Sequence, residues 1–290
     1  MATYDAERIG SSPWLLTGPA MLVFVTLLAA PLVLTAMLSL NLFSDTEGVI
    51  PIYTFANYLE VFSDDYFHEI FLRTGGMAIA VTFFCVLLGV PETLIIARMR
   101  SPWRSLFLLV VLGPLLISVV VRTIGWAILL GNNGLINQAL QALGITEFPI
   151  RMMFTQFGVV LALTHVLVPF MVIAVWASLQ KLDVQVEQAG LSLGASRMRT
   201  FRRVVLPQIM PGILSGSIIV FALAASAFAT PAIIGGRRLK VVATAAYDEF
   251  LGSLNWPLGA AIAVLLLIAN LVIVVGCSRL AERRFKHVFE

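Results

Sequence analysis

The chain alternates between long apolar stretches and short polar segments. Six stretches are each long enough to cross a bilayer, because a hydrocarbon core of about 30 Å requires about 20 apolar residues in helical form. Four contain no Asp, Glu, Lys or Arg, whereas the second contains only Glu92 and the third only Arg122. This pattern predicts transmembrane helices at about 13–40, 74–97, 105–130, 152–180, 208–236 and 251–278.

The composition agrees with a membrane protein. Of the 290 residues, 59% are hydrophobic and 12% are charged, whereas ordinary soluble domains carry about 25% charged residues. A membrane β-barrel would instead show short segments of alternating polarity. We therefore expect an all-α polytopic membrane protein, with residues 1–290 forming one transmembrane domain.

The distribution of cations predicts the orientation of the helices. Lys and Arg are concentrated in 1–12, 98–104, 181–207 and 279–290, and cytoplasmic segments carry the excess of these residues. Acidic residues crowd the first loop on the opposite side, as Asp45, Glu47, Glu60, Asp64, Asp65 and Glu69. Both termini and the segment 181–207 are therefore expected in the cytoplasm.

The polar segment 181–207 predicts two short amphipathic helices joined at Gly194, which permits a sharp turn. Before the glycine, small and apolar residues recur at helical spacing, as Val186, Ala189, Gly190 and Leu193. After it, one face carries Met198, Phe201 and Val205, and another carries Arg199, Arg202 and Arg203. A long amphipathic insert of this kind is typical of a docking element for another protein.

Catalysis by this chain is not expected. The sequence lacks a G-x-x-x-x-G-K-[ST] phosphate loop, a Gly-x-Ser-x-Gly nucleophile motif, and a pair of aspartates within the spans. Its histidines, His68, His165 and His287, are too scattered to suggest a metal site. We expect no bound cofactor and no metal, and an integral membrane enzyme would lack its catalytic residues.

The segment from Gln188 to Pro207 resembles the EAA loop of the membrane subunits of bacterial ABC importers. That pattern reads Glu-Ala-Ala, three residues, Gly, nine residues and Ile-x-Leu-Pro. Gly194 takes the place of the glycine, and the flanking positions of the pattern fall without a gap on Gln188, Ala189, Gly190, Val204, Leu206 and Pro207. Gln188 replaces the glutamate of the pattern, although Glu187 precedes it, and Gly190 replaces the second alanine.

The resemblance implies that this segment couples the chain to a separate ATPase, through Glu187, Gln188, Ala189, Gly190, Leu193 and Gly194. ATP-driven closure of the ATPase dimer would then push on the segment and rock the helical bundle between inward-facing and outward-facing states. The alternative is an ordinary amphipathic loop helix that rests on lipid headgroups, with its arginines on anionic lipid.

Other motifs resemble the spermidine/putrescine-type branch of these permeases: Gly89-x-Pro91, Ser118-x-x-x-Arg122-Thr123-x-x-Trp126, Gly134-Leu135-Ile136-Asn137, Pro169-Phe170 and Trp256-Pro257-x-Gly259. Such a subunit pairs in the bacterial inner membrane with a second permease, usually a related but different chain. Two cytoplasmic ATPase subunits and a periplasmic or lipid-anchored solute-binding protein complete the importer. The implied substrate is a polyamine, and the same branch includes importers of opines, aminophosphonates and iron.

Four residues are candidates for the transport pathway, because ionisable groups inside a membrane usually face the bundle interior or a water-filled cavity. Arg122 lies one helical turn from Trp126, and the alternative for this arginine is to anchor the loop 131–137. Glu92 follows Pro91 and could attract a cationic substrate or pair with an arginine such as Arg98. His165 could contact substrate or form an interhelical hydrogen bond.

Two further features concern contacts. Tyr247, Asp248 and Glu249 are expected on the outer side, where they would meet the solute-binding protein or remain solvated loop residues. Gly212-x-x-x-Gly216 would let two helices approach closely at the start of the fifth span.

The competing function is an ion-gradient-driven secondary transporter. Such a carrier usually has more spans, an inverted repeat and interrupted helices at the midplane, and the sequence shows none of these signals.

Overall fold

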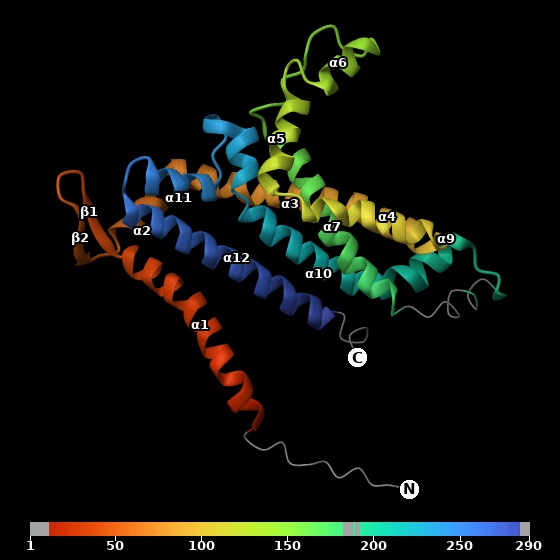
Figure 1. Cartoon of the computed structure of the whole chain (residues 1–290), viewed down its shortest axis with the longest axis horizontal. Coiled ribbons are helices and arrows are strands. Elements are labelled where there is room, and N and C mark those ends of the chain that lie inside the picture. The colour runs from red at the N-terminus through yellow and green to blue at the C-terminus, as the bar shows by residue number, and fades with distance from the viewer. Residues whose placement is uncertain (1–11, 182–187, 189–191, 285–290) are drawn as a thin grey trace.

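The structure is a computed structural model that describes residues 12–181, 188 and 192–284, and it shows a helical bundle with a small β-hairpin at one end (Figure 1). Within these residues, six helices are long and apolar enough to cross a membrane. They are Thr17–Leu38, Asp65–Arg98, Val119–Ala142, Gln156–Leu179, Arg197–Ala225 and Trp256–Arg283. The predicted all-α polytopic class is therefore confirmed.

The elements follow one another in chain order as α1 (Ser12–Leu38), β1 (Asn41–Ser44), β2 (Gly48–Tyr53), α2 (Ala56–Ser63), α3 (Asp65–Arg98), α4 (Trp103–Leu112), α5 (Val119–Leu130), α6 (Leu135–Ala142), α7 (Gln156–Leu179), α9 (Arg197–Thr200), α10 (Leu206–Ala225), α11 (Val242–Leu251) and α12 (Trp256–Arg284). A 3₁₀ turn at Gly113–Leu116 follows α4, and π-helical turns occupy Phe201–Val205 and Pro231–Gly235.

Helix α7 is the centre of the bundle. It packs against both α3 and α10, which also contact each other. Its buried residues, among them Val159, Leu163, Met171 and Val175, lie on several faces. A helix that is apolar on all sides is usually buried in this way. At one end of the bundle, α2, α3, α11 and α12 share a second apolar cluster that includes Phe67, Val242 and Ile262.

Two glycines allow α10 to pack closely on α7. A Cβ at Gly212 would lie 2.5 Å from the Ser178 hydroxyl oxygen and 2.6 Å from the Ala174 carbonyl oxygen. A Cβ at Gly216 would lie 2.8 Å from the Met171 sulfur. The close approach predicted from the Gly-x-x-x-Gly spacing is therefore confirmed, and it lies between two of the central helices.

Replacement of Gly212 by alanine is expected to destabilise the bundle by about 1–3 kcal/mol, which is the usual cost of forcing extra atoms into a packed core. The clash involves backbone as well as side chain, so rotamer changes cannot relieve it. Gly76 on α3 is the matched control, because a Cβ there has nothing within 4 Å. Thermal unfolding of the purified protein should show a lower melting temperature for Gly212→Ala and no loss for Gly76→Ala. Equal melting temperatures would contradict the close contact.

The predicted continuous third span at 105–130 is wrong. Helix α4 passes into the 3₁₀ turn at Gly113–Leu116, and α5 starts only at Val119. Pro114 lacks a backbone N–H and cannot continue α-helical hydrogen bonding, and Ser118 has extended backbone with ψ 134°. The chain therefore changes direction here, and α5 and α6 project from the rest of the bundle (Figure 1).

The fifth predicted span, at 208–236, also ends early. Helix α10 stops at Ala225, and the Ser226 hydroxyl donates a 2.7 Å hydrogen bond to the Ala222 carbonyl. A π-helical turn beginning at Pro231 follows, and much of the predicted outer loop 237–250 is helix α11. The last helix consequently begins at Trp256 instead of the predicted 251.

The first outer loop is more ordered than the sequence predicted. Strands β1 and β2 pair as an antiparallel hairpin, an element that the hydropathy pattern did not predict. Helix α2 lies in the same loop. Helix α3 begins at Asp65, nine residues before the predicted 74, because the Asp64 side chain caps its first turn by accepting from the Tyr66 amide at 2.9 Å.

Candidate functional site

The predicted coupling segment has a tight turn at its centre. Gly194 has a φ of +82°, a conformation that glycine adopts without steric cost. A Cβ at this position would meet nothing within 4 Å. Leu193 is 88% exposed and Gln188 is exposed, so both side chains are accessible to a partner. Three other predicted coupling residues, Glu187, Ala189 and Gly190, lie outside the described residues.

The second half of this segment is not a separate short helix. Ser196 caps α9 by accepting from the Arg199 amide at 3.4 Å, and α9 continues through the π-helical turn at Phe201–Val205 into α10. The result is one helix from Arg197 to Ala225. The predicted division into two faces is largely confirmed: Val205 is buried and Phe201 half-buried, Met198 is exposed, and the arginines are exposed, at Arg199, Arg202 and Arg203.

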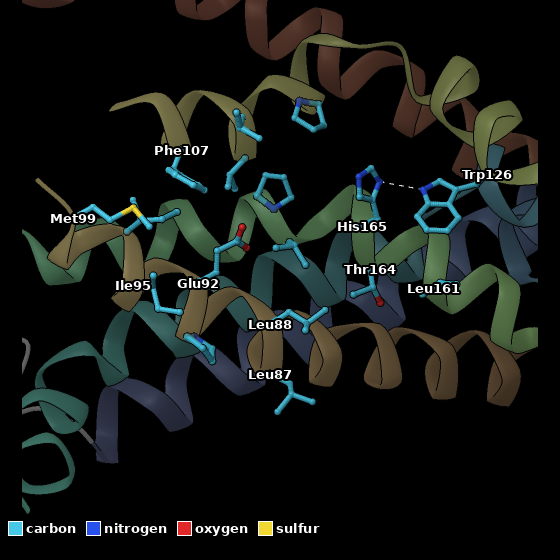
Figure 2. Close-up of a pocket in the computed structure, with 17 residues that line it drawn as sticks. Leu87, Leu88, Glu92, Ile95, Met99, Phe107, Trp126, Leu161, Thr164 and His165 are labelled. Atoms are coloured by element: carbon cyan, nitrogen blue, oxygen red, sulfur yellow. Dashed lines mark hydrogen bonds between the residues drawn. The ribbon is translucent and has the colours of Figure 1, made fainter. Parts of the chain in front are cut away.

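A cavity of about 760 Å³ lies among α3, α4 and α7, and Trp126 of α5 also lines it (Figure 2). Its lining is mostly apolar, with Leu88, Ile95 and Phe107 among the contributors. The polar groups are few, namely Glu92, Thr164, His165 and the indole of Trp126. A mostly apolar cavity with a small number of placed polar groups is the usual form of a small-molecule site.

Trp126 and His165 form an interhelical pair at one side of this cavity. The Trp126 Nε1–H donates to His165 Nδ1 at 3.1 Å, and the two rings meet edge to face with centroids 5.4 Å apart (Figure 2). The interhelical hydrogen bond predicted for His165 is therefore present. Because Nδ1 accepts, Nε2 carries the proton of the neutral imidazole, which leaves a donor available to a ligand.

Glu92 extends from α3 into the same cavity (Figure 2). It forms no ion pair with Arg98, and its carboxylate has no hydrogen bond or ion pair to any residue in the described part of the chain. A carboxylate without a partner, close to aromatic side chains, is chemically suited to bind an ammonium group. The carboxylate attracts the ammonium by its charge, and the aromatic rings attract it by cation–π interaction.

Arg122 does not line this cavity. It lines a separate cavity of about 360 Å³ together with Phe170 and Thr230. Its Nε and Nη1 atoms are buried and have no hydrogen-bond partner among the described residues. Among the described residues, no hydrogen bond joins the Arg122 side chain to the loop 131–137, so the anchoring alternative is not supported.

Asn137 anchors that loop instead, a role that the sequence analysis did not assign. Its amide nitrogen donates to the carbonyls of Gly131 and Ile150, each at 3.0 Å, and its amide oxygen accepts from the Ile150 N–H at 2.9 Å. Asn137 is fully buried. The sequence signal that could have indicated this role was the place of Asn137 in the Gly134-Leu135-Ile136-Asn137 motif. A polar amide among apolar residues points to an anchoring role if it is buried, because a buried amide must have its hydrogen bonds satisfied.

The predicted contact residues for a binding protein lie on α11. Asp248 forms an ion pair with Lys240, so its charge is neutralised within the chain. Glu249 accepts a hydrogen bond from Ser253, and Tyr247 packs against Phe228 with ring centroids 4.9 Å apart. The role of Tyr247, Asp248 and Glu249 as partner contacts stays a prediction.

The charge of Glu249 also acts on Glu60 in α2. Partial burial, followed by the charges of Glu249 and Asp64, raises the pKa of the Glu60 carboxyl above its ordinary value.

No protein-family model matches the chain. It is 33% identical over 247 residues to the spermidine/putrescine transport system permease protein PotB of Salmonella typhimurium, a match that covers 84% of this chain and 86% of the relative. It is 35% identical over 201 residues to the molybdenum transport system permease protein ModB of Mycobacterium bovis, covering 69% of this chain and 74% of that protein.

Among solved structures, a chain of the bacterial alginate ABC transporter, in complex with an alginate pentasaccharide-bound periplasmic protein, has the same fold. The TM-score is 0.78 and the identity 18%, over 95% of this chain and 96% of that chain. Six apolar helices, this fold and the identity to permeases over most of the length agree with one another. This multi-pass inner-membrane chain therefore belongs to the family of ABC transporter permeases that includes the spermidine/putrescine permease PotB.

Proposed function

We propose that this chain is one of two transmembrane subunits of an ATP-driven importer and that its cargo is a polyamine. The observation that carries the proposal is the 33% identity to a spermidine/putrescine permease over most of both chains. The Glu92 carboxylate, which has no partner among the described residues and lies in a cavity lined by Phe107 and Trp126, supports it, because a polyamine carries several ammonium groups.

The proposed partners supply what this chain lacks. The second permease would complete the pathway, two cytoplasmic ATPase subunits would hydrolyse ATP, and a periplasmic or lipid-anchored binding protein would deliver the solute. Both termini and the turn at Gly194 would face the cytoplasm. The exposed Gln188 and Leu193 side chains at this turn would dock in a groove of the ATPase.

In the proposed pathway, Glu92 draws the ammonium groups of the solute into the cavity, and the face of Trp126 contacts them. The hydrogen bond from Trp126 holds the His165 ring in place, so that its Nε2–H can donate to a water molecule beside the solute. Apolar walls suit the methylene chain of a polyamine. Arg122 as a pathway residue stays a prediction.

A second candidate cargo is a solute that carries both an ammonium and an acidic group, such as an opine or an aminophosphonate. The observation that favours it is Arg122, whose buried Nε and Nη1 atoms have no partner among the described residues. A guanidinium with unsatisfied donors is suited to a carboxylate or phosphonate. This residue would repel a polyamine.

Replacement of Arg122 by glutamine is expected to separate the two cargoes. Uptake of an opine or aminophosphonate should fall about tenfold or more, because a hydrogen bond to a charged group contributes about 1.5–3 kcal/mol. Polyamine uptake should not fall. The measurement is uptake of each radiolabelled solute by cells that carry the wild-type or variant importer, normalised to the amount of assembled complex. A polyamine-specific loss would contradict this assignment of Arg122.

The proposed function is tested by purification of the tagged chain and reconstitution in liposomes. We expect a second permease and an ATPase to co-purify, and polyamine uptake to require both ATP and the binding protein. Thermal-shift screening of the binding protein against polyamines, opines, phosphonates and ferric ion identifies the cargo. Uptake by this chain alone, driven by an ion gradient without nucleotide, would establish the secondary-transporter alternative instead.

A further inference from the structure

Three arginines surround one cavity outside the helical core. The cavity has a volume of about 590 Å³, and its lining includes Arg151, Arg237 and Arg238 together with Phe154. All three arginines are exposed. None of their guanidinium groups has a hydrogen bond or an ion pair to any residue that the structure describes. This group of three, named here the arginine patch, is therefore a concentration of unneutralised positive charge.

Two loops in contact with each other bring the arginine patch together. The Phe154 N–H donates to the Ile234 carbonyl at 2.8 Å, which fastens the segment after Arg151 to the π-helical turn before Arg237. Phe154 has a φ of +62° and Gly236 a φ of +59°. The Phe154 ring lies 2.8 Å from the position of a Cβ on Gly236. Non-glycine residues in this conformation cost about 1–3 kcal/mol and persist only where the surrounding structure holds them.

Other cations on nearby segments are already neutralised, which distinguishes the patch from ordinary loop charge. Arg73 pairs with Glu69 and also donates to the Lys240 carbonyl at 3.1 Å. Lys240 pairs with Asp248. The arginine patch lies in the loops that follow the predicted third and fifth spans, and the charge bias places both loops on the outer side.

We propose that the arginine patch is the docking site for acidic side chains of the solute-binding protein. The inference rests on the proposed function, since only an importer of this kind receives its solute from such a protein. Guanidinium groups bind carboxylates in a bidentate manner, and three of them around a hollow suit an inserted acidic loop better than a flat lipid surface. This site replaces Asp248 as the main charged contact, because Asp248 is already paired.

The test uses the complete importer in nanodiscs of zwitterionic lipid and its own solute-loaded binding protein. The Arg237→Glu/Arg238→Glu double variant should weaken the binding protein's affinity for the importer by about tenfold to a hundredfold, because like charges at an interface cost several kcal/mol. Arg151→Glu should act in the same direction. The charge-preserving double variant Arg237→Lys/Arg238→Lys should retain most of the affinity.

Arg279→Glu is the matched control, because Arg279 is exposed on α12, beyond the last predicted span. It should leave the affinity unchanged. ATPase activity without binding protein should be the same in all variants, and higher salt should weaken wild-type binding more than binding by the double variant.

Unchanged affinity in the double variant overturns the inference. The inference is also overturned if the double variant loses co-purified anionic lipid or inorganic phosphate but binds the solute-binding protein with unchanged affinity. Failure of the proposed function is separately visible, because the wild-type complex would then show no ATPase stimulation by any binding protein, and the docking inference would fall with it.

Discussion

Replacement of Gly194 by valine is expected to reduce ATP-driven uptake about tenfold or more while the permease and ATPase subunits still assemble. Gly194 has a φ of +82°, and a β-branched residue there is a genuine outlier. The strain of about 1–3 kcal/mol would move the turn out of its native conformation. Because a Cβ meets nothing within 4 Å, the effect arises from the backbone and not from a steric clash with a neighbour.

The measurement compares uptake with ATP hydrolysis in the reconstituted importer. Loss of uptake with hydrolysis retained would show that the turn transmits motion. Asparagine tolerates the left-handed conformation, so Gly194→Asn serves as the matched variant and should keep most of the activity. Wild-type uptake by Gly194→Val would contradict a coupling role for this turn.

Replacement of Glu92 by glutamine is expected to reduce the maximal rate of polyamine uptake about tenfold or more. The carboxylate faces the cavity without a partner among the described residues, and a charge-assisted hydrogen bond to an ammonium contributes about 1.5–3 kcal/mol. The side chains have nearly the same shape, so the change removes charge and little else. Radiolabelled polyamine uptake at saturating binding protein measures the effect.

Two further variants make this result specific. Glu92→Asp keeps the charge and should restore part of the rate, whereas Glu282→Gln removes an exposed charge near the end of α12 and should have no effect. The affinity of the binding protein for polyamine should not change in any of them. If Glu92→Gln transports at the wild-type rate, Glu92 is not part of the pathway.

The spans could be predicted from sequence because bilayer thickness fixes the length of an apolar helix. Their burial could not. Helices α1 and α7 are both apolar on all sides, yet α7 is the buried centre of the bundle and α1 is largely exposed. Hydropathy measures only that a helix avoids water. It does not distinguish a neighbouring helix from lipid or from another subunit.

The breaks within spans were missed for a related reason. Pro114 lies in the 3₁₀ turn that follows α4, and Pro231 begins a π-helical turn after α10, yet Pro91 and Pro169 lie inside helices that continue. Proline in a membrane helix is tolerated where neighbours satisfy the freed carbonyl, and those neighbours are known only from the fold. The sequence therefore shows where the prolines are, but not which of them interrupt a helix.

The polar residues that line the cavity could be predicted from the sequence, but the cavity itself could not. Glu92, Trp126 and His165 were candidates because polar groups inside a membrane are costly. Whether these three side chains line one cavity depends on how α3, α5 and α7 pack, and the periodicity of apolar residues in the sequence does not determine that packing. Arg122 shared the same chemical argument and lies in another cavity. Likewise, the arginine patch joins Arg151 to Arg237 and Arg238, 86 or more positions away, and contacts such as Phe154 with Ile234 and Gly236 bring the two loops together.

The unbroken run from Arg197 to Ala225 has a mechanical consequence. At 1.5 Å per residue, its 29 residues make a rod about 44 Å long. A rod of that length pivoting by about 10° at one end carries its other end through about 8 Å. The far end adjoins the Arg122 cavity, which Leu223 and Ser226 line. A small rotation at the arginine-rich tip would thus be magnified into a displacement wide enough to admit or exclude a solute.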